Sequence, residues 1–398
     1  MKKVKVKNLE MFEYAVKKPV TIAADGKKST LADVAQNPSL SMANLFSMED
    51  KLQIELTVER YIPEPDFRLG IFEHGSMSKE EVIDSVKNQT LIGQDIVRAE
   101  MVYCQELMQN LNNPEPIPAK PKIPDIEPEP IPPYYHWIPK DWWQRWTFLR
   151  NTALFCENTT DDVTQKATPY RFKHVHPAFT KRGFNVVVLK DINDDRFQFV
   201  DALKKNRVTY ISGIGHGSPT TFTGHLGSPI LKVGSYNPEE VKGKTIHLLS
   251  CQTAKQLGPD LIRNGAKAYA GYYENFTFIY DQPATPFDDM ELFWQCDSTY
   301  DIMLAGGATV QEAHEATIRT YNACIAKPGV AGTATATWLT HDRNYFMTPV
   351  IDGKYGSKST KLYPYVAIRV PRLESAEELF AAPESELEFE PSEVEPAN

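Results

Sequence analysis

The second half of the chain contains short, almost continuously apolar runs that are rich in β-branched and aromatic residues. These runs comprise residues 152–157, 185–190, 208–214, 245–251 and 266–272. Stretches with the polar and apolar spacing of helices lie between them or follow them, near residues 165–182, 194–206, 254–264, 286–296 and 309–326. Continuously apolar runs are typical of strands buried on both faces of a parallel sheet. The alternation with helices therefore predicts an α/β fold with helices on both faces of that sheet.

The first 111 residues show a different and more mixed pattern. Residues 52–61 alternate well enough to predict a strand, and residues 91–111 have one apolar face, which predicts a helix. Ser78 followed by Glu81 is typical of the capping box that opens a helix. His74-Gly75-Ser76 is interpreted as a turn without chemistry. We expect a small α+β module here that docks to a regulatory protein partner.

Proline separates the two halves. Nine prolines fall between Pro114 and Pro133, a density that excludes a helix or central strand and predicts an extended polyproline II spacer. The predicted organisation is a module at 1–111, a proline-rich linker at 112–135, a catalytic α/β domain at 136–372 and a disordered tail at 373–398.

Charge changes this picture only at the tail. The formal net charge is −9, and residues 373–398 contain nine glutamates but no Lys, Arg or Asp. The rest of the chain is therefore neutral, which argues against nucleic-acid binding. No secretory leader and no apolar run long enough for a membrane span is present, so we expect a cytoplasmic protein without a membrane partner.

The five cysteines are odd in number, and none belongs to a C-x-x-C pair. This pattern supports neither structural zinc nor a disulfide framework and suggests a reducing compartment. We therefore predict no metal and no cofactor, while a calcium requirement is left open. A reduced thiol in such a chain is a candidate nucleophile.

Two strand ends carry the candidate chemistry. The run 208–214 continues into Gly215-His216-Gly217, and the run 245–251 ends at Cys251. Functional residues gather at the carboxyl ends of strands in an open parallel sheet, so His216 and Cys251 are expected to face one another. A helix opening after Cys251 would favour its thiolate, and the N–H groups of Gly217 and Cys251 would stabilise an oxyanion. The alternative is that Cys251 is a small buried hydrophobic residue.

The segments VTYISGIGHGSPTTF and KTIHLLSCQTAKQLGPDLIRNGAKAYAGYYENF resemble the caspase-fold cysteine peptidases, most closely their gingipain- and clostripain-like bacterial branches. The resemblance covers about residues 147–330. It implies a caspase-like parallel-sheet α/β sandwich. It also implies that Cys251 is the nucleophile, that His216 is the base and leaving-group acid, and that Gly217 lies at the oxyanion position.

The resemblance also places the pocket for the residue before the scissile bond (P1) in two acidic loops. The first loop contains Glu157, Asp161 and Asp162, where caspases carry an arginine, and the second contains Glu274 and Asp281. Carboxylates pair well with Lys and Arg, so cleavage after a basic residue is predicted. The alternatives are that these acids are ordinary solvated residues, or that Glu157 instead orients His216.

The leading hypothesis is a cysteine endopeptidase with a Cys-His dyad and a protein substrate. Both constitutive activity and latency until activation through residues 1–111 are left open. A catalytically silent scaffold that uses the same fold for binding is the competing hypothesis.

Overall fold

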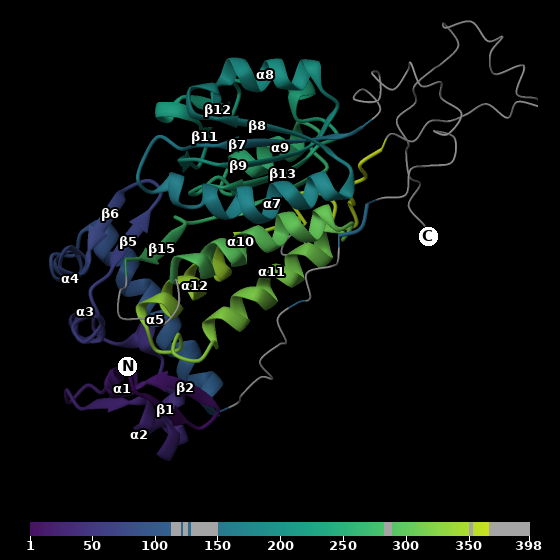
Figure 1. Cartoon of the computed structure of the whole chain (residues 1–398). Helices are drawn as coiled ribbons and strands as arrows, with labels where there is room; N and C mark the ends of the chain where they lie inside the picture. Colours follow the sequence, from purple (N-terminus) through teal and green to yellow (C-terminus); the bar gives the residue numbers. More distant parts are fainter. Residues whose placement is uncertain (113–120, 122–125, 129–149, 282–288, 350–352, 366–398) are drawn as a thin grey trace, which may run out of the picture.

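The computed structural model describes residues 1–112, 121, 126–128, 150–281, 289–349 and 353–365 (Figure 1). The predicted linker at 112–135 falls almost entirely outside these ranges, and the predicted tail at 373–398 falls outside them completely. No helix in the described ranges is long and apolar enough to cross a membrane.

A six-stranded, mostly parallel sheet forms the centre of the second half, in the order β16-β14-β13-β9-β7-β8. The strands are β7 (Thr152–Glu157), β8 (Asn185–Lys190), β9 (Val208–Ile214), β13 (Thr245–Leu249), β14 (Ala268–Tyr272) and the antiparallel edge strand β16 (Phe346–Met347). The first three have the predicted bounds, and β13 and β14 are each two residues shorter than predicted. The expected mixed α/β class with a parallel sheet is confirmed.

Helices cover both faces of this sheet (Figure 1). They are α7 (Thr168–Arg182), α8 (Arg196–Lys205), α9 (Leu257–Arg263), α10 (Asp289–Ala305), α11 (Val310–Ile325) and α12 (Ala334–Tyr345). Side chains alternate between the faces along each strand. On β7, Leu154 belongs to the hydrophobic cluster of Phe199 on α8, whereas its neighbour Phe155 belongs to that of Phe179 on α7. The alternation explains why nearly every position of these strands is apolar.

Residues 1–112 contain both strands and helices. They are β1 (Lys3–Val6), β2 (Leu9–Phe12), α1 (Glu13–Lys17), β3 (Pro19–Ile22), β4 (Lys28–Thr30), α2 (Leu31–Gln36), α3 (Asp50–Tyr61), β5 (Arg68–Ile71), β6 (Gly75–Ser78), α4 (Lys79–Lys87) and α5 (Leu91–Asn112). The capping box of Ser78 and Glu81 opens α4 as predicted. The helix predicted at 91–111 is α5.

The strand predicted at 52–61 is wrong, because this segment is the helix α3. Its buried residues Leu56, Thr57, Arg60 and Tyr61 recur at helical spacing, which the two-residue alternation of apolar side chains concealed. Arg60 is buried because it forms an ion pair with Glu100 on α5. From the sequence alone, a charged residue such as Arg60 is expected to face solvent, so its burial could not be predicted.

The first 112 residues are joined to the second half by strand pairing and by buried charges. Strand β5 pairs antiparallel with β15 (Thr277–Tyr280), the segment that follows β14. Lys18 forms a buried ion pair with Glu64, whose Oε1 accepts the N–H of Ala334 at 2.8 Å. On the next turn of α12, the hydroxyl of Thr337 donates to Glu100 at 2.9 Å. The two halves therefore share one packed interface along α12.

A buried ion-pair network lies beneath the sheet. Arg171 on α7 donates to Glu157 at the end of β7 (2.9 Å), to Asp301 on α10 (2.8 Å) and to Ser212 on β9 (2.9 Å). On β13, His247 Nδ1 lies 2.9 Å from the same Asp301. All these groups are essentially excluded from solvent, so each charge depends on its partners.

Replacing Arg171 with Met should lower the free energy of unfolding by about 3–5 kcal/mol, because the carboxylates of Glu157 and Asp301 would stay buried without their cation. Urea unfolding followed by circular dichroism measures this change. Arg319→Met is the matched control, since that residue is partly exposed and makes only a loose 3.8 Å pair with Glu315; it should change the free energy by no more than about 0.5 kcal/mol. Equal effects of the two substitutions would contradict a central role for the network.

Candidate active site

The ends of β9 and β13 bring His216 and Cys251 to the same edge of the sheet. These strands are parallel neighbours, and Ile214 pairs with Leu249. The N–H of Gly215 donates to the carbonyl of Leu249 at 3.4 Å, which continues the pairing one residue further. His216 and Cys251 each lie two residues beyond the Ile214–Leu249 pair, so the expected juxtaposition of the two strand ends is present.

Gly217 lies tightly against the segment that carries Cys251. A Cβ atom at this position would be 2.1 Å from Ser250 Oγ and 2.6 Å from the carbonyl oxygen of Cys251. No side chain larger than hydrogen fits there without moving backbone. The glycine therefore allows the His216 loop and the Cys251 loop to come into contact.

Asp161 holds His216. Its Oδ2 atom lies 3.0 Å from His216 Nε2, and its carboxylate also accepts the N–H groups of Val163 and Thr164, each at 2.9 Å. Burial by itself would raise the pKa of Asp161, but hydrogen bonds from His216 and Thr164 lower it below its usual value. Burial by itself would lower the pKa of His216, but Asp161 and the charge of Glu73 raise it above its usual value.

The other ring nitrogen of His216, Nδ1, is buried and has no hydrogen-bond partner among the described residues. With Nε2 donating to Asp161, Nδ1 is left as an acceptor. It is therefore the ring nitrogen without a described partner that can accept a proton.

Glu157 does not orient His216, and it is not open to a substrate. Its side chain is fully buried, accepts a hydrogen bond from Arg171 and lies 2.8 Å from His176 Nε2. Residue 157 ends β7, and its side chain faces Arg171 and His176 of α7. Asp161 instead lies on the loop beyond the strand. The sequence analysis placed Glu157 and Asp161 in the same acidic loop, because the pattern of residues does not show which of the two side chains is buried.

The Cys251 thiol is fully buried. Burial and then the charge of Glu73 raise its pKa, although backbone hydrogen bonding to Phe276 and Glu73 acts in the opposite direction. The expectation that a helix opens at Cys251 is wrong, because residues 251–256 form turns and α9 begins only at Leu257. Gln252 has a φ of +57°, which helical residues do not adopt. The helix dipole therefore gives this thiol no support.

Glu73, a residue for which the sequence predicted no chemistry, reaches the site from the first half of the chain. It lies in the turn between β5 and β6, and its carboxylate accepts a hydrogen bond from the N–H of Gly217. Burial raises the pKa of Glu73. The interpretation of His74-Gly75-Ser76 as a turn is correct only for His74, because the turn covers residues 72–74 and Gly75 and Ser76 begin β6. A contact between positions 144 residues apart leaves no signal in the pattern of a single sequence.

The remaining acids that were predicted for the P1 pocket make different contacts. Asp162 accepts a hydrogen bond from Gln165 at 3.0 Å, and Glu274 forms a 2.9 Å ion pair with Lys255. Asp281 follows the end of β15 and is exposed. With Asp161 bonded to His216, the described contacts of these acids are each made to a different residue.

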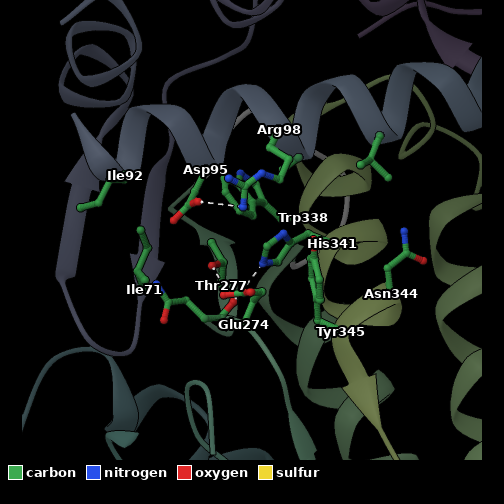
Figure 2. Close-up of a pocket in the computed structure, with 13 residues that line it drawn as sticks. Ile71, Ile92, Asp95, Arg98, Glu274, Thr277, Trp338, His341, Asn344 and Tyr345 are labelled. Carbon is green, nitrogen blue, oxygen red and sulfur yellow. Dashed lines mark hydrogen bonds and ion pairs between the residues drawn. The ribbon is translucent and has the colours of Figure 1, made fainter. Parts of the chain in front are cut away.

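A small cavity lies beside the Glu274 loop rather than at the dyad (Figure 2). It is walled by Asp95 and Arg98 of α5 and by His341 and Tyr345 of α12. Figure 2 shows Asp95 paired with Arg98, three residues further along the same helix. Its lining includes neither dyad residue, so the cavity belongs to the boundary between the two halves.

His247, Asp297 and Asp301 form a buried group whose side-chain ligand atoms lie within 4.8 Å of one another. Burial would lower the pKa of His247, but the charges of Asp301 and Asp297 raise it to about 9. A protonated imidazole and the guanidinium of Arg171 thus already neutralise these carboxylates. This donor set fits an ion-pair network better than a metal site.

No protein-family model matches the chain, and no curated protein matches it. The peptidase resemblance therefore rests on the residues of the two strand ends.

Replacing Asp161 with Asn should lower the pKa of His216, because the variant removes the charge that stabilises the imidazolium. A titration of selectively labelled histidine by nuclear magnetic resonance measures the shift. Asp162→Asn is the matched control, since its carboxylate bonds only to Gln165, and it should leave His216 unchanged. An unchanged pKa in Asp161→Asn would refute the role of Asp161 in holding His216.

Proposed function

We propose that this protein is a cysteine endopeptidase of the caspase fold that uses Cys251 and His216. The observation that supports this most directly is the pairing of Ile214 with Leu249, which puts the His and Cys positions at equal depth beyond adjacent strands. The close packing of Gly217 on Cys251 adds a backbone N–H beside the sulfur-bearing residue. A nucleophile, a base held by a third group and an oxyanion donor are the parts that acyl transfer requires.

The reaction follows from these positions. His216 Nδ1 accepts the proton of the Cys251 thiol, and the thiolate attacks the carbonyl carbon of the scissile peptide bond. The N–H of Gly217 donates to the oxyanion that develops. His216 then gives its proton to the leaving amine, and water releases the acid product from the thioester. Asp161 keeps the imidazole in the orientation and tautomer that these transfers need.

Cleavage after Lys or Arg is part of the proposal. Asp161 and Glu73 lie beside His216, and the Glu274 loop contacts the segment after Cys251 through the N–H of Gln252 (3.2 Å). A basic side chain is the one that this negative surrounding attracts. The acids supply a field around the dyad rather than a single dedicated pocket.

One observation favours the competing function, a binding scaffold without activity. Cys251 is completely shielded from solvent, and burial raises the pKa of its thiol. A scaffold would leave the thiol in this state permanently, whereas a peptidase must expose it to substrate.

A peptidyl acyloxymethyl ketone with Lys or Arg at P1 distinguishes the two functions. We expect it to label Cys251, with loss of more than about 90% of the label in His216→Ala, because a base contributes roughly 100-fold or more to such chemistry. Peptide mapping by mass spectrometry locates the label, and a positional-scanning peptide library gives the P1 preference. His174→Ala on α7 is the control and should label like the native protein.

No labelling of the native protein or of variants that expose the thiol would leave the scaffold as the function. A preference for Asp at P1 would contradict the argument from charge while leaving the peptidase assignment intact.

A further inference from the structure

We propose that the β5–β6 hairpin is a built-in inhibitor that closes the candidate active site by placing the carboxylate of Glu73 on the N–H of Gly217. The inference rests on the proposed peptidase function, because that N–H is the group that would bind the carbonyl oxygen of a substrate. A substrate can use it only after Glu73 has left.

Strand pairing brings the hairpin turn to this position. Along β5, Gly70 pairs with Phe278 and Ile71 with Thr277, and the N–H of Phe72 donates to the carbonyl of Phe276 at 3.4 Å. A Cβ at Gly70 would lie 2.5 Å from the Phe278 ring, so only glycine permits this close pairing. Glu73 thus lies two residues beyond the end of β5, at the end of the hairpin that reaches Gly217.

Aromatic packing anchors the base of the turn. The ring of Phe72 lies with its centroid 5.3 Å from that of Phe276, 6.0 Å from that of Phe278 and 6.4 Å from that of Trp294. Phe72 is fully buried, whereas Glu73 and His74 are exposed residues at the tip. The turn is held at its base and can move at its tip.

The charge of Glu73 acts against catalysis as well as its position. It raises the pKa of the Cys251 thiol and also contributes to raising that of His216. Both effects favour a protonated thiol beside an imidazolium, a pair in which neither partner can begin the attack. Removing Glu73 removes its contribution to both pKa shifts, while burial still acts on Cys251 and Asp161 still acts on His216.

Opening requires only the turn to move. The rest of the first half is fastened to α12 by hydrogen bonds from Ala334 and Thr337 to Glu64 and Glu100. These two acids also belong to the buried Lys18–Glu64 and Arg60–Glu100 ion pairs, so separating them from α12 is costly. Glu73 is held by smaller contacts, since its carboxylate accepts the N–H of Gly217 and its backbone hydrogen-bonds to Cys251. Regulation through residues 1–111 is therefore a displacement of residues 72–74 rather than the undocking of the whole segment.

The test compares native full-length protein with Glu73→Ala, Glu73→Gln and the control Glu80→Gln, an exposed glutamate at the start of α4. Two quantities are measured: the rate at which iodoacetamide alkylates Cys251, read by peptide mapping, and the hydrolysis of a fluorogenic peptide amide with Arg at P1. Alkylation of the buried Cys104 in the same samples reports any general loosening. Thermal melting confirms that each variant is folded.

We expect Glu73→Ala to raise the alkylation rate of Cys251 at least about tenfold, equivalent to about 1.4 kcal/mol. Glu73→Gln should raise it less, since the amide oxygen still accepts a hydrogen bond but carries no charge. Glu80→Gln and the Cys104 rate should not change. Should Glu73→Ala fold poorly, Glu73→Gln decides the question.

An unchanged Cys251 rate in folded Glu73 variants, or an equal rise at Cys104, would overturn the inhibitory role of the hairpin whatever the hydrolysis shows. Faster alkylation without hydrolysis in any variant would instead retain the hairpin as a cover of Cys251 and reject the peptidase function. Faster alkylation with faster hydrolysis supports both.

Discussion

The ion-pair network around Arg171 is the constraint on which the rest of the structure depends. One guanidinium binds Glu157 on β7, Ser212 on β9 and Asp301 on α10, and Asp301 in turn pairs with His247 on β13. Three parallel strands are thereby held in a single register against two helices. Two of these strands end at the candidate dyad, so the network sets the relative depth of His216 and Cys251. Charges buried this deeply tolerate no slippage, because a shift of one residue would leave them unpaired.

The first half of the chain acts on this rigid frame from outside. It adds β5 and β6 beside β15 and fastens itself to α12 through buried charges. Within this frame, the tip of the β5–β6 hairpin is the part that can move without separating the two halves. This tip makes only a few small contacts with the site, and through them it reaches the N–H of Gly217. Because the rest of the first half is fixed to α12, a movement of Glu73 alone can free the N–H of Gly217.

Local patterns predicted much of the fold. The five apolar runs of the sheet, the capping box at Ser78 and the helices α5 and α11 depend on side chains near one another in the chain. The helix α3 was mistaken for a strand because Arg60 is buried by a partner 40 residues away. The helix predicted to open at Cys251 was wrong because the turns at 251–256 pack against the Gly217 loop and the Glu274 loop, neither of which is local.

For the site, the sequence by itself determined which residue types stand at two strand ends: His216 between glycines, and Cys251 after a buried run. The physical reason is that parallel strands deliver their following residues to one edge. Only the tertiary structure decided that Asp161 rather than Glu157 holds His216. The two acids are four residues apart in the chain, but Glu157 is buried at the end of β7 whereas Asp161 lies on the following loop beside His216. It alone placed Glu73 on Gly217, because that contact depends on strand pairing between β5 and β15, more than 200 residues apart in the chain. Pairing between distant strands follows from the whole packed fold, and no single segment encodes it.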